Sequence, residues 1–167
     1  MNKVTMHGNE LSLMGVLPKI GDNICDFSVK ANDMSVKTAK DYADKVLVVL
    51  TVPSIDTPVC DMEIKKFNDT AASLPEDIKI ISVSADLPFA QGRWAAETGI
   101  KNITMLSDYY DMNFADSFGV HIKELRLLTR AVFVYDKNGK LVYSQVLDEI
   151  TKEPDYDKAL EAAKSAL

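Results

Sequence analysis

Cysteine and histidine are scarce in this chain, and their scarcity excludes several classes of protein. The 167 residues contain two cysteines, Cys25 and Cys60, and two histidines, His7 and His121. Two cysteines in a chain of this length do not make the disulfide framework of a small secreted domain. The cysteines form no Cys-x-x-Cys pair and the histidines lie far apart in the sequence, so there is no local zinc signature. We therefore expect neither a disulfide scaffold nor a bound metal.

The sequence also lacks a basic patch, a long apolar run and a glycine-rich phosphate loop. Its net charge is −6 and no Lys/Arg run occurs, so neither nucleic acid nor an anionic membrane surface is expected as a partner. The longest apolar run, Val46 to Leu50, is far too short to cross a bilayer. Residues 1–15 lack the apolar core of a signal peptide. We expect a cytoplasmic protein that needs no nucleotide cofactor.

The apolar residues, 47% of the chain, predict a single folded domain over residues 1–167 with a core of its own. Residues 46–52 are continuously apolar or β-branched, which predicts a strand covered on both faces, as in a parallel sheet. Turn signals at Gly8-Asn9 and Asn138-Gly139 predict a hairpin near each end of the chain. The remaining expected elements are strands at 25–29, 78–85 and 103–108, a brief helical segment near 38–43, helices at 58–73 and 87–98, a helix that ends near Gly119 and a last helix that Pro154 opens.

Strands that alternate with helices and then end in an antiparallel pair indicate an α/β fold. This order predicts a three-layer domain with a mixed central sheet and an N-terminal β-hairpin. No repeat, linker or low-complexity segment interrupts it.

The stretch TVPSIDTPVC, at residues 51–60, places Cys60 at the start of a helix. Pro53 ends the preceding strand, Thr57 is a good N-cap, and Pro58 suits the first helical position. Cys60 then lies in the first turn, where unpaired N–H groups and the helix dipole favour a thiolate.

Two acidic residues close to Cys60 oppose the formation of a thiolate. Asp61 and Glu63 disfavour a thiolate, since nearby negative charge stabilises the protonated thiol. A reactive Cys60 would therefore need a cation from elsewhere in the fold. A free cysteine is also commonly a small buried hydrophobic residue, so its position alone leaves both roles open.

The spacing Pro-x-x-x-Thr-x-x-Cys, at Pro53, Thr57 and Cys60, resembles the active-site motif of the peroxiredoxins. The N-terminal hairpin is typical of one subgroup, the bacterial thiol peroxidases, and the resemblance covers essentially the whole chain. Three further segments are similar to the corresponding segments of that subgroup: SADLPFAQGRW at 84–94, LLTRAVFVYD at 127–136 and DEITKEPDYDKAL at 148–160.

This resemblance implies a thioredoxin-like fold and a thiol-dependent peroxidase that reduces hydrogen peroxide and organic hydroperoxides. Cys60 would be the nucleophile and would become a sulfenic acid. Arg130 matches the family arginine and would supply the missing cation. Thr57 would hydrogen-bond the sulfur and the peroxide, and Pro53 would shield the thiolate from water. The resemblance further implies a homodimer, no cofactor, and thioredoxin or another thiol as reductant.

One position departs from the family pattern. Members of the subgroup usually carry a resolving cysteine after the aromatic residue of an Arg-aromatic pair, and here Ala95 follows Arg93-Trp94. Either the natural protein is a one-cysteine enzyme recycled by an external thiol, or a cysteine has been replaced by alanine. Cys25 is interpreted as a buried strand residue; the alternative is that it resolves Cys60, within or between subunits.

Two other functions fit the same fold. One is a thiol–disulfide oxidoreductase, which the missing Cys-x-x-Cys pair disfavours. The other is a redox sensor in which Cys60 is oxidised without being recycled.

Overall fold

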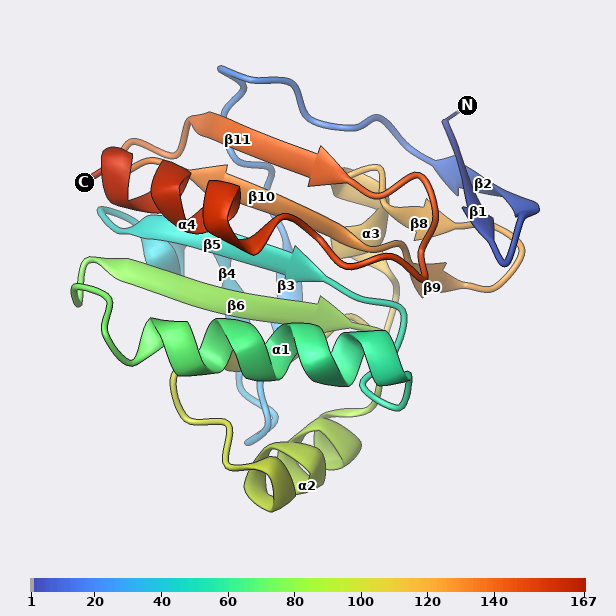
Figure 1. Cartoon of the computed structure of the whole chain (residues 1–167), viewed down its shortest axis with the longest axis horizontal. Coiled ribbons are helices and arrows are strands. Elements are labelled where there is room, and N and C mark those ends of the chain that lie inside the picture. The colour runs from blue at the N-terminus through green and yellow to red at the C-terminus, as the bar shows by residue number, and fades with distance from the viewer. Residues whose placement is uncertain (1) are drawn as a thin grey trace.

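The computed structural model describes residues 2–167, which form two β-sheets and the helices that pack on them (Figure 1). The helices are α1 (Pro58–Ala71), α2 (Pro88–Thr98), α3 (Asn113–Ser117), α4 (Tyr156–Ser165) and the short 3₁₀ helix η1 (Ala39–Tyr42). The strands are β1 (Lys3–Met6), β2 (Asn9–Met14), β3 (Ser28–Lys30), β4 (Val36–Thr38), β5 (Val46–Thr51), β6 (Ile78–Ser84), β7 (Thr104–Ser107), β8 (His121–Ile122), β9 (Leu127–Leu128), β10 (Ala131–Tyr135) and β11 (Leu141–Val146).

The larger sheet is mixed, as its sequence pattern predicts. Its strand order is β11-β10-β5-β6-β7-β3-β4, and the smaller sheet has the order β1-β2-β8-β9. Strands β5, β6 and β7 are parallel, whereas β10 and β11 extend the sheet antiparallel on one side and β3 and β4 on the other. Helices α1 and α4 lie on one face and α3 lies on the other (Figure 1). The predicted three-layer α/β fold is therefore confirmed.

The central strand β5 contributes side chains to two separate apolar clusters. All six of its residues are buried, and successive side chains point to opposite faces of a sheet. Val46, Val48 and Leu50 pack toward α1, α2 and α4. Leu47 and Val49 pack toward α3. The continuous apolar run thus reflects a strand covered on both faces.

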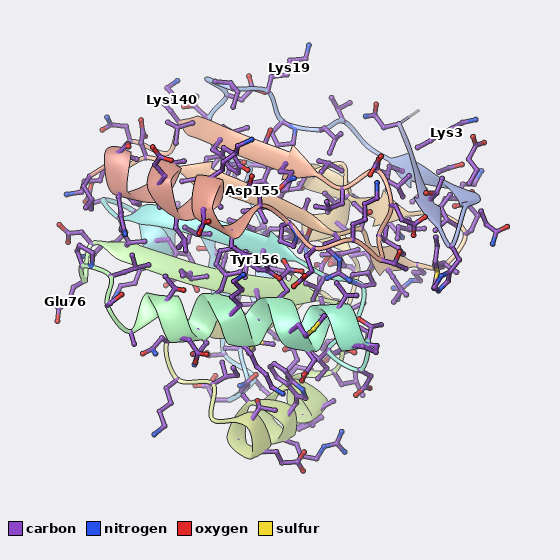
Figure 2. The ribbon with its side chains drawn as sticks, in the orientation of Figure 1. Lys3, Lys19, Glu76, Lys140, Asp155 and Tyr156 are labelled. Carbon is purple, nitrogen blue, oxygen red and sulfur yellow. The ribbon has the colours of Figure 1, made fainter. Side chains whose placement is uncertain are left out.

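Tyr156 joins the two helices on the first face. It follows the N-cap Asp155 and lies between α4 and α1 in Figure 2. Its ring centroid is 5.2 Å from that of Phe67 on α1, and the Lys66 ammonium lies 4.2 Å from the ring centroid. These contacts position α4 against the helix that carries Cys60.

Several boundaries differ from the sequence expectations. The N-terminal hairpin turns at His7 and Gly8, whose φ angles are 50° and 82°, instead of at Gly8-Asn9. The expected strand at 25–29 begins only at β3, so the interpretation of Cys25 as a buried strand residue is wrong: Cys25 is half-buried in an extended loop. Helix α4 begins after Asp155, whose side chain caps it, and not at Pro154. Strands β4, β8 and β9 have no expected counterpart, because two- and three-residue strands carry almost no periodicity.

None of the helices in the described part of the chain is both long enough and apolar enough to span a membrane.

Candidate active site

The loop between β5 and α1 is held by a carboxylate from the neighbouring strand. Asp86 follows β6, and the carboxyl ends of the parallel strands β5 and β6 lie at the same edge of the sheet. Its carboxylate accepts hydrogen bonds from the Ser54 hydroxyl at 2.8 Å and from the Ile55 N–H at 2.9 Å. These bonds fix the loop that leads into α1. Sequence analysis missed Asp86, although its place directly after a buried strand is a usable signal.

Helix α1 starts where the sequence predicts. Thr57 is the N-cap, its hydroxyl accepts the Cys60 N–H at 3.4 Å, and Pro58 occupies the first helical position. The Thr57 hydroxyl also donates to the Ser54 carbonyl at 3.0 Å, which orients its oxygen toward the helix. Cys60 therefore lies in the first turn, with 0% of its surface exposed.

Arg130 reaches the sulfur from the adjacent strand. It immediately precedes β10, which pairs with β5 so that Ala131 lies beside Thr51. Its Nη2 donates to the Cys60 Sγ at 3.2 Å. Its Nε donates to the Ile150 carbonyl at 2.8 Å, which fixes the plane of the guanidinium. Arg130 is only 2% exposed, so its charge acts on the thiol with little screening by water. Arg130 thus places a cation within hydrogen-bond distance of the Cys60 sulfur.

Glu63 is the second partner of Arg130. It lies three residues after Cys60, on the same side of α1, and its Oε2 accepts from the Arg130 Nη1 at 2.6 Å. Its side chain is fully buried. Burial raises the pKa of Glu63 to about 7, and the charge of Arg130 opposes this shift without cancelling it. The other carboxyl oxygen, Oε1, is buried with no hydrogen-bond partner.

The sequence presented Glu63 only as a negative charge that disfavours a thiolate. In the structure Glu63 is paired, and it also anchors the arginine that contacts the sulfur. The three-residue spacing from Cys60 was the available signal, because residues i and i+3 share a helix face.

A cavity of about 310 Å³ opens beside this site. Pro53, Thr57 and Arg130 line it, together with Met6 and His7 from the N-terminal hairpin. The remaining lining is mostly apolar and includes Val59, Leu125, Leu127 and Ile150. The structure thus brings all four candidate residues together at one place: Pro53, Thr57, Cys60 and Arg130. No feature of the sequence pointed to Met6 or His7.

Comparisons with known proteins agree with this geometry. The family model described as Redoxin matches residues 19–160. The thiol peroxidase of Bacillus subtilis (strain 168) is 47% identical over 165 residues, which cover 99% of this chain and 98% of that protein. The chain belongs to the thiol peroxidase family. A second member, from Halalkalibacterium halodurans, is 47% identical over the full length of both chains.

Solved structures support the same assignment. The peroxiredoxin-like protein of Aquifex aeolicus has a TM-score of 0.93 and 39% identity, and the match covers 100% of this chain and 98% of that one. The thiol peroxidase of Chromobacterium violaceum, at 20% identity and a TM-score of 0.85, shares the fold. The predicted resemblance to the thiol peroxidases is confirmed, and so is the predicted thioredoxin-like fold.

Position 95, where a resolving cysteine was expected, does not line the cavity beside Cys60. Ala95 lies on α2 and lines a separate cavity of about 310 Å³, together with Ala31, Ile100 and Ile103. Ala95 also packs against the apolar cluster that contains Cys60, and a disulfide between positions 60 and 95 would have to meet narrow limits of distance.

The residue before Ala95 links the two helices directly. Trp94, the only tryptophan, donates its indole N–H to the Asp61 carboxylate at 3.1 Å. The other oxygen of Asp61 accepts from Lys65 at 2.8 Å. Because Asp61 follows Cys60, this hydrogen bond ties the first turn of α1 to α2.

Cys25 lies on the other side of the central sheet from Cys60. It packs against the cluster that contains Leu47 and Val49, whereas Cys60 belongs to the cluster on the opposite face. Burial raises the pKa of the Cys25 thiol, and Asp22 and Asp26 add to the effect. Cys25 is thus remote from the site and is held in the less reactive protonated form.

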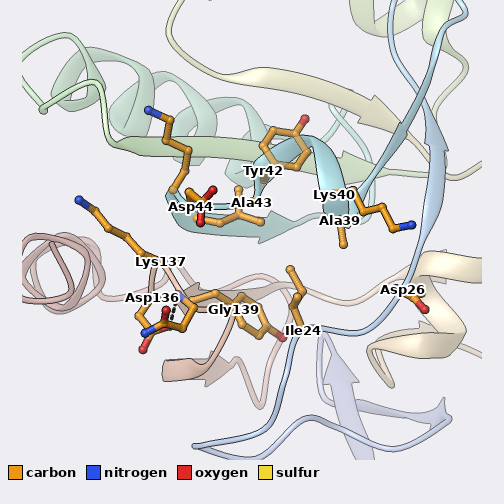
Figure 3. A pocket seen from close by; sticks show the side chains of 14 residues that line it. Ile24, Asp26, Ala39, Lys40, Tyr42, Ala43, Asp44, Asp136, Lys137 and Gly139 are labelled. Atoms are coloured by element: carbon orange, nitrogen blue, oxygen red, sulfur yellow. Dashed lines mark hydrogen bonds between the residues drawn. The ribbon is translucent and has the colours of Figure 1, made fainter.

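A larger cavity of about 460 Å³ has no connection with the thiol site (Figure 3). It lies between η1 and the turn that joins β10 to β11, and Tyr42, Lys137 and Gly139 line it. Candidate active-site residues are not among those lining it. Within residues 2–167, no group of three or more His, Cys, Asp or Glu side chains is placed to hold a metal ion.

Proposed function

We propose that this member of the thiol peroxidase family reduces hydrogen peroxide and organic hydroperoxides, with Cys60 as the nucleophile. The observation that carries the proposal is the hydrogen bond from Arg130 Nη2 to the Cys60 sulfur at 3.2 Å. A buried guanidinium and a helix N-terminus both favour a thiolate at this position.

In the first half-reaction, the Cys60 thiolate attacks the terminal oxygen of R–O–O–H and the O–O bond breaks. The sulfur keeps this oxygen as a sulfenic acid, and RO⁻ takes up a proton and leaves as an alcohol, or as water when the substrate is hydrogen peroxide. Arg130 stabilises the thiolate and the negative charge that develops on the peroxide oxygens. Thr57 orients the peroxide through its hydroxyl, and Pro53 keeps water away from the sulfur.

In the second half-reaction, an external thiol restores Cys60. One thiol condenses with the sulfenic acid to form a mixed disulfide and water, and a second thiol displaces Cys60 as a free thiol. This route needs no cysteine at position 95. Thioredoxin or a small thiol would supply both equivalents.

A coupled assay tests this function. Peroxide consumption with thioredoxin, or with dithiothreitol, should continue for many turnovers in the unaltered chain and stop in Cys60→Ser. The matched control is Cys25→Ser, which should retain the activity because Cys25 lies across the sheet. A single turnover per chain would instead indicate a redox sensor. Disulfide exchange without peroxide consumption would indicate a thiol–disulfide oxidoreductase.

The oxidation product identifies the partner of Cys60. After one equivalent of peroxide, mass spectrometry should find one added oxygen, and a dimedone-type reagent should trap the sulfenic acid. Loss of two hydrogens, with Cys25 and Cys60 linked, would make Cys25 the resolving residue.

Homodimer formation is also part of the proposal. Large apolar side chains are exposed near the start of both α1 and α2: Met62 is 49% exposed, Leu87 50% and Phe89 68%. A contact between two copies of the chain over these helices would remove the three side chains from water, which favours association. Phe89→Glu should convert a dimer into a monomer in sedimentation experiments, and an unchanged sedimentation coefficient would refute this surface. Cytoplasmic location stays a prediction from the sequence.

A further inference from the structure

The turn between β1 and β2 forms part of the wall of the cavity beside Cys60. Met6 and His7 line this cavity together with Pro53, Thr57 and Arg130. The hairpin is far from Cys60 in sequence, so specific contacts must hold its turn in place over the site.

One carboxylate receives most of those contacts. Glu149 accepts hydrogen bonds from the Thr5 hydroxyl at 2.6 Å, the His7 N–H at 3.0 Å and the Gly8 N–H at 3.1 Å. Its Oε1 also accepts from the N–H and the hydroxyl of Thr151. His7 and Gly8 have positive φ angles, of 50° and 82°, which is unfavourable for a non-glycine residue. Because both turn N–H groups donate to one anion, Glu149 stabilises this conformation.

The same loop also holds the arginine. Ile150 follows Glu149, and its carbonyl accepts the Arg130 Nε–H at 2.8 Å, while its own N–H donates to the Thr5 carbonyl at 2.9 Å. Two consecutive residues therefore connect the hairpin wall to the group that contacts the Cys60 sulfur.

Glu149 keeps its charge throughout the range in which a peroxidase works. The Thr5 hydroxyl, together with the N–H groups of Gly8 and His7, lowers the pKa of Glu149 to about 2. The turn of the β1–β2 hairpin is thus held by a group that stays negatively charged. The position of the hairpin beside the cavity therefore does not change with pH near neutrality.

We propose that Glu149 is a positioning residue that fixes the hairpin wall and thereby sets the preference for hydroperoxides with a bulky apolar group. This inference rests on the proposed function. Hydrogen peroxide has no apolar body to contact Met6, so its reaction depends on the groups around the Cys60 sulfur and not on the hairpin. A bulky substrate gains additional binding from the apolar wall only while the hairpin stays in place.

The test is the ratio of second-order rate constants for cumene hydroperoxide and hydrogen peroxide. Glu149→Gln leaves one acceptor oxygen and introduces an N–H₂ group among donors, so the turn should loosen. The ratio should fall about tenfold, equivalent to the loss of roughly two CH₂ groups of apolar contact. Thr5→Val removes one donor while keeping a strand-forming residue, and should lower the ratio on the order of threefold. Glu10→Gln, at an exposed position on the same hairpin, is the matched control.

The outcomes separate three explanations. A fall in the ratio for Glu149→Gln and Thr5→Val, with Glu10→Gln unchanged, supports the inference. Unchanged ratios in the folded variants overturn it, and so do parallel falls in both rate constants, which would indicate a purely structural role. If the unaltered chain consumes neither peroxide, the proposed function itself fails.

Discussion

Arg130→Lys is the substitution that most directly tests the chemistry of the site. Arginine here donates to three separate groups: the Ile150 carbonyl, the Glu63 carboxylate and the Cys60 sulfur. Lysine keeps the positive charge but has a single ammonium group and lacks the planar fork of donors. We expect the ammonium to stay with Glu63, the shortest of the three contacts, and to leave the sulfur.

The size of the effect follows from the lost bond. A hydrogen bond to a charged group contributes about 1.5–3 kcal/mol. If the whole of it acts on the transition state, the rate constant for peroxide falls by about 10- to 150-fold. The ion pair with Glu63 persists, so the fold should survive.

Stopped-flow fluorescence can measure this rate. Trp94, the only tryptophan, hydrogen-bonds Asp61, the residue after Cys60, and should report oxidation of the site. The matched control is Arg93→Lys, an exposed position on α2, which should react like the unaltered chain. Circular dichroism would establish that both variants are folded. A folded Arg130→Lys protein whose rate stays within twofold of the unaltered chain would refute the role given to Arg130.

Three further predictions concern the surroundings of Cys60. The raised pKa of Glu63 means that the folded chain binds this proton more tightly than the unfolded chain, so stability should fall as pH rises from about 4.5 to about 7. At about 1.4 kcal/mol per pKa unit, the loss in the free energy of unfolding is on the order of 3 kcal/mol. Urea unfolding of Glu63→Gln at several pH values should not show this loss. If the variant and the unaltered chain lose stability equally with pH, the assignment to Glu63 is wrong. Trp94→Phe removes the hydrogen bond to Asp61 and keeps an aromatic ring at this position, so alkylation of Cys60 should become about two- to tenfold faster. An unchanged rate would mean that this bond does not restrain the first turn. Ala95→Cys should form a disulfide with Cys60 after one equivalent of peroxide and permit turnover by thioredoxin, and a persistent sulfenic acid in mass spectrometry would show that the two positions do not meet.

Local sequence signals determined most of the fold. The apolar run at 46–52 predicted β5, because a strand buried on both faces needs apolar side chains at every position. Thr57 and Pro58 predicted the start of α1, because capping depends on residues adjacent in the chain. The N-terminal turn was misplaced by one residue, since His7 adopts a positive φ that Glu149, far away in the sequence, stabilises.

The sequence by itself also determined which residues are candidates for the site, through the spacing of Pro53, Thr57 and Cys60 and through its resemblance to the thiol peroxidases. Only the tertiary structure decided what surrounds the sulfur. From the sequence alone, Glu63 is a negative charge that disfavours a thiolate. The pairing of β10 with β5 places Arg130 between the Glu63 carboxylate and Cys60. Capping and strand burial depend on neighbours in the chain and can be read from the sequence. An ion pair between residues 67 positions apart depends on strand pairing across the sheet, which local sequence does not specify.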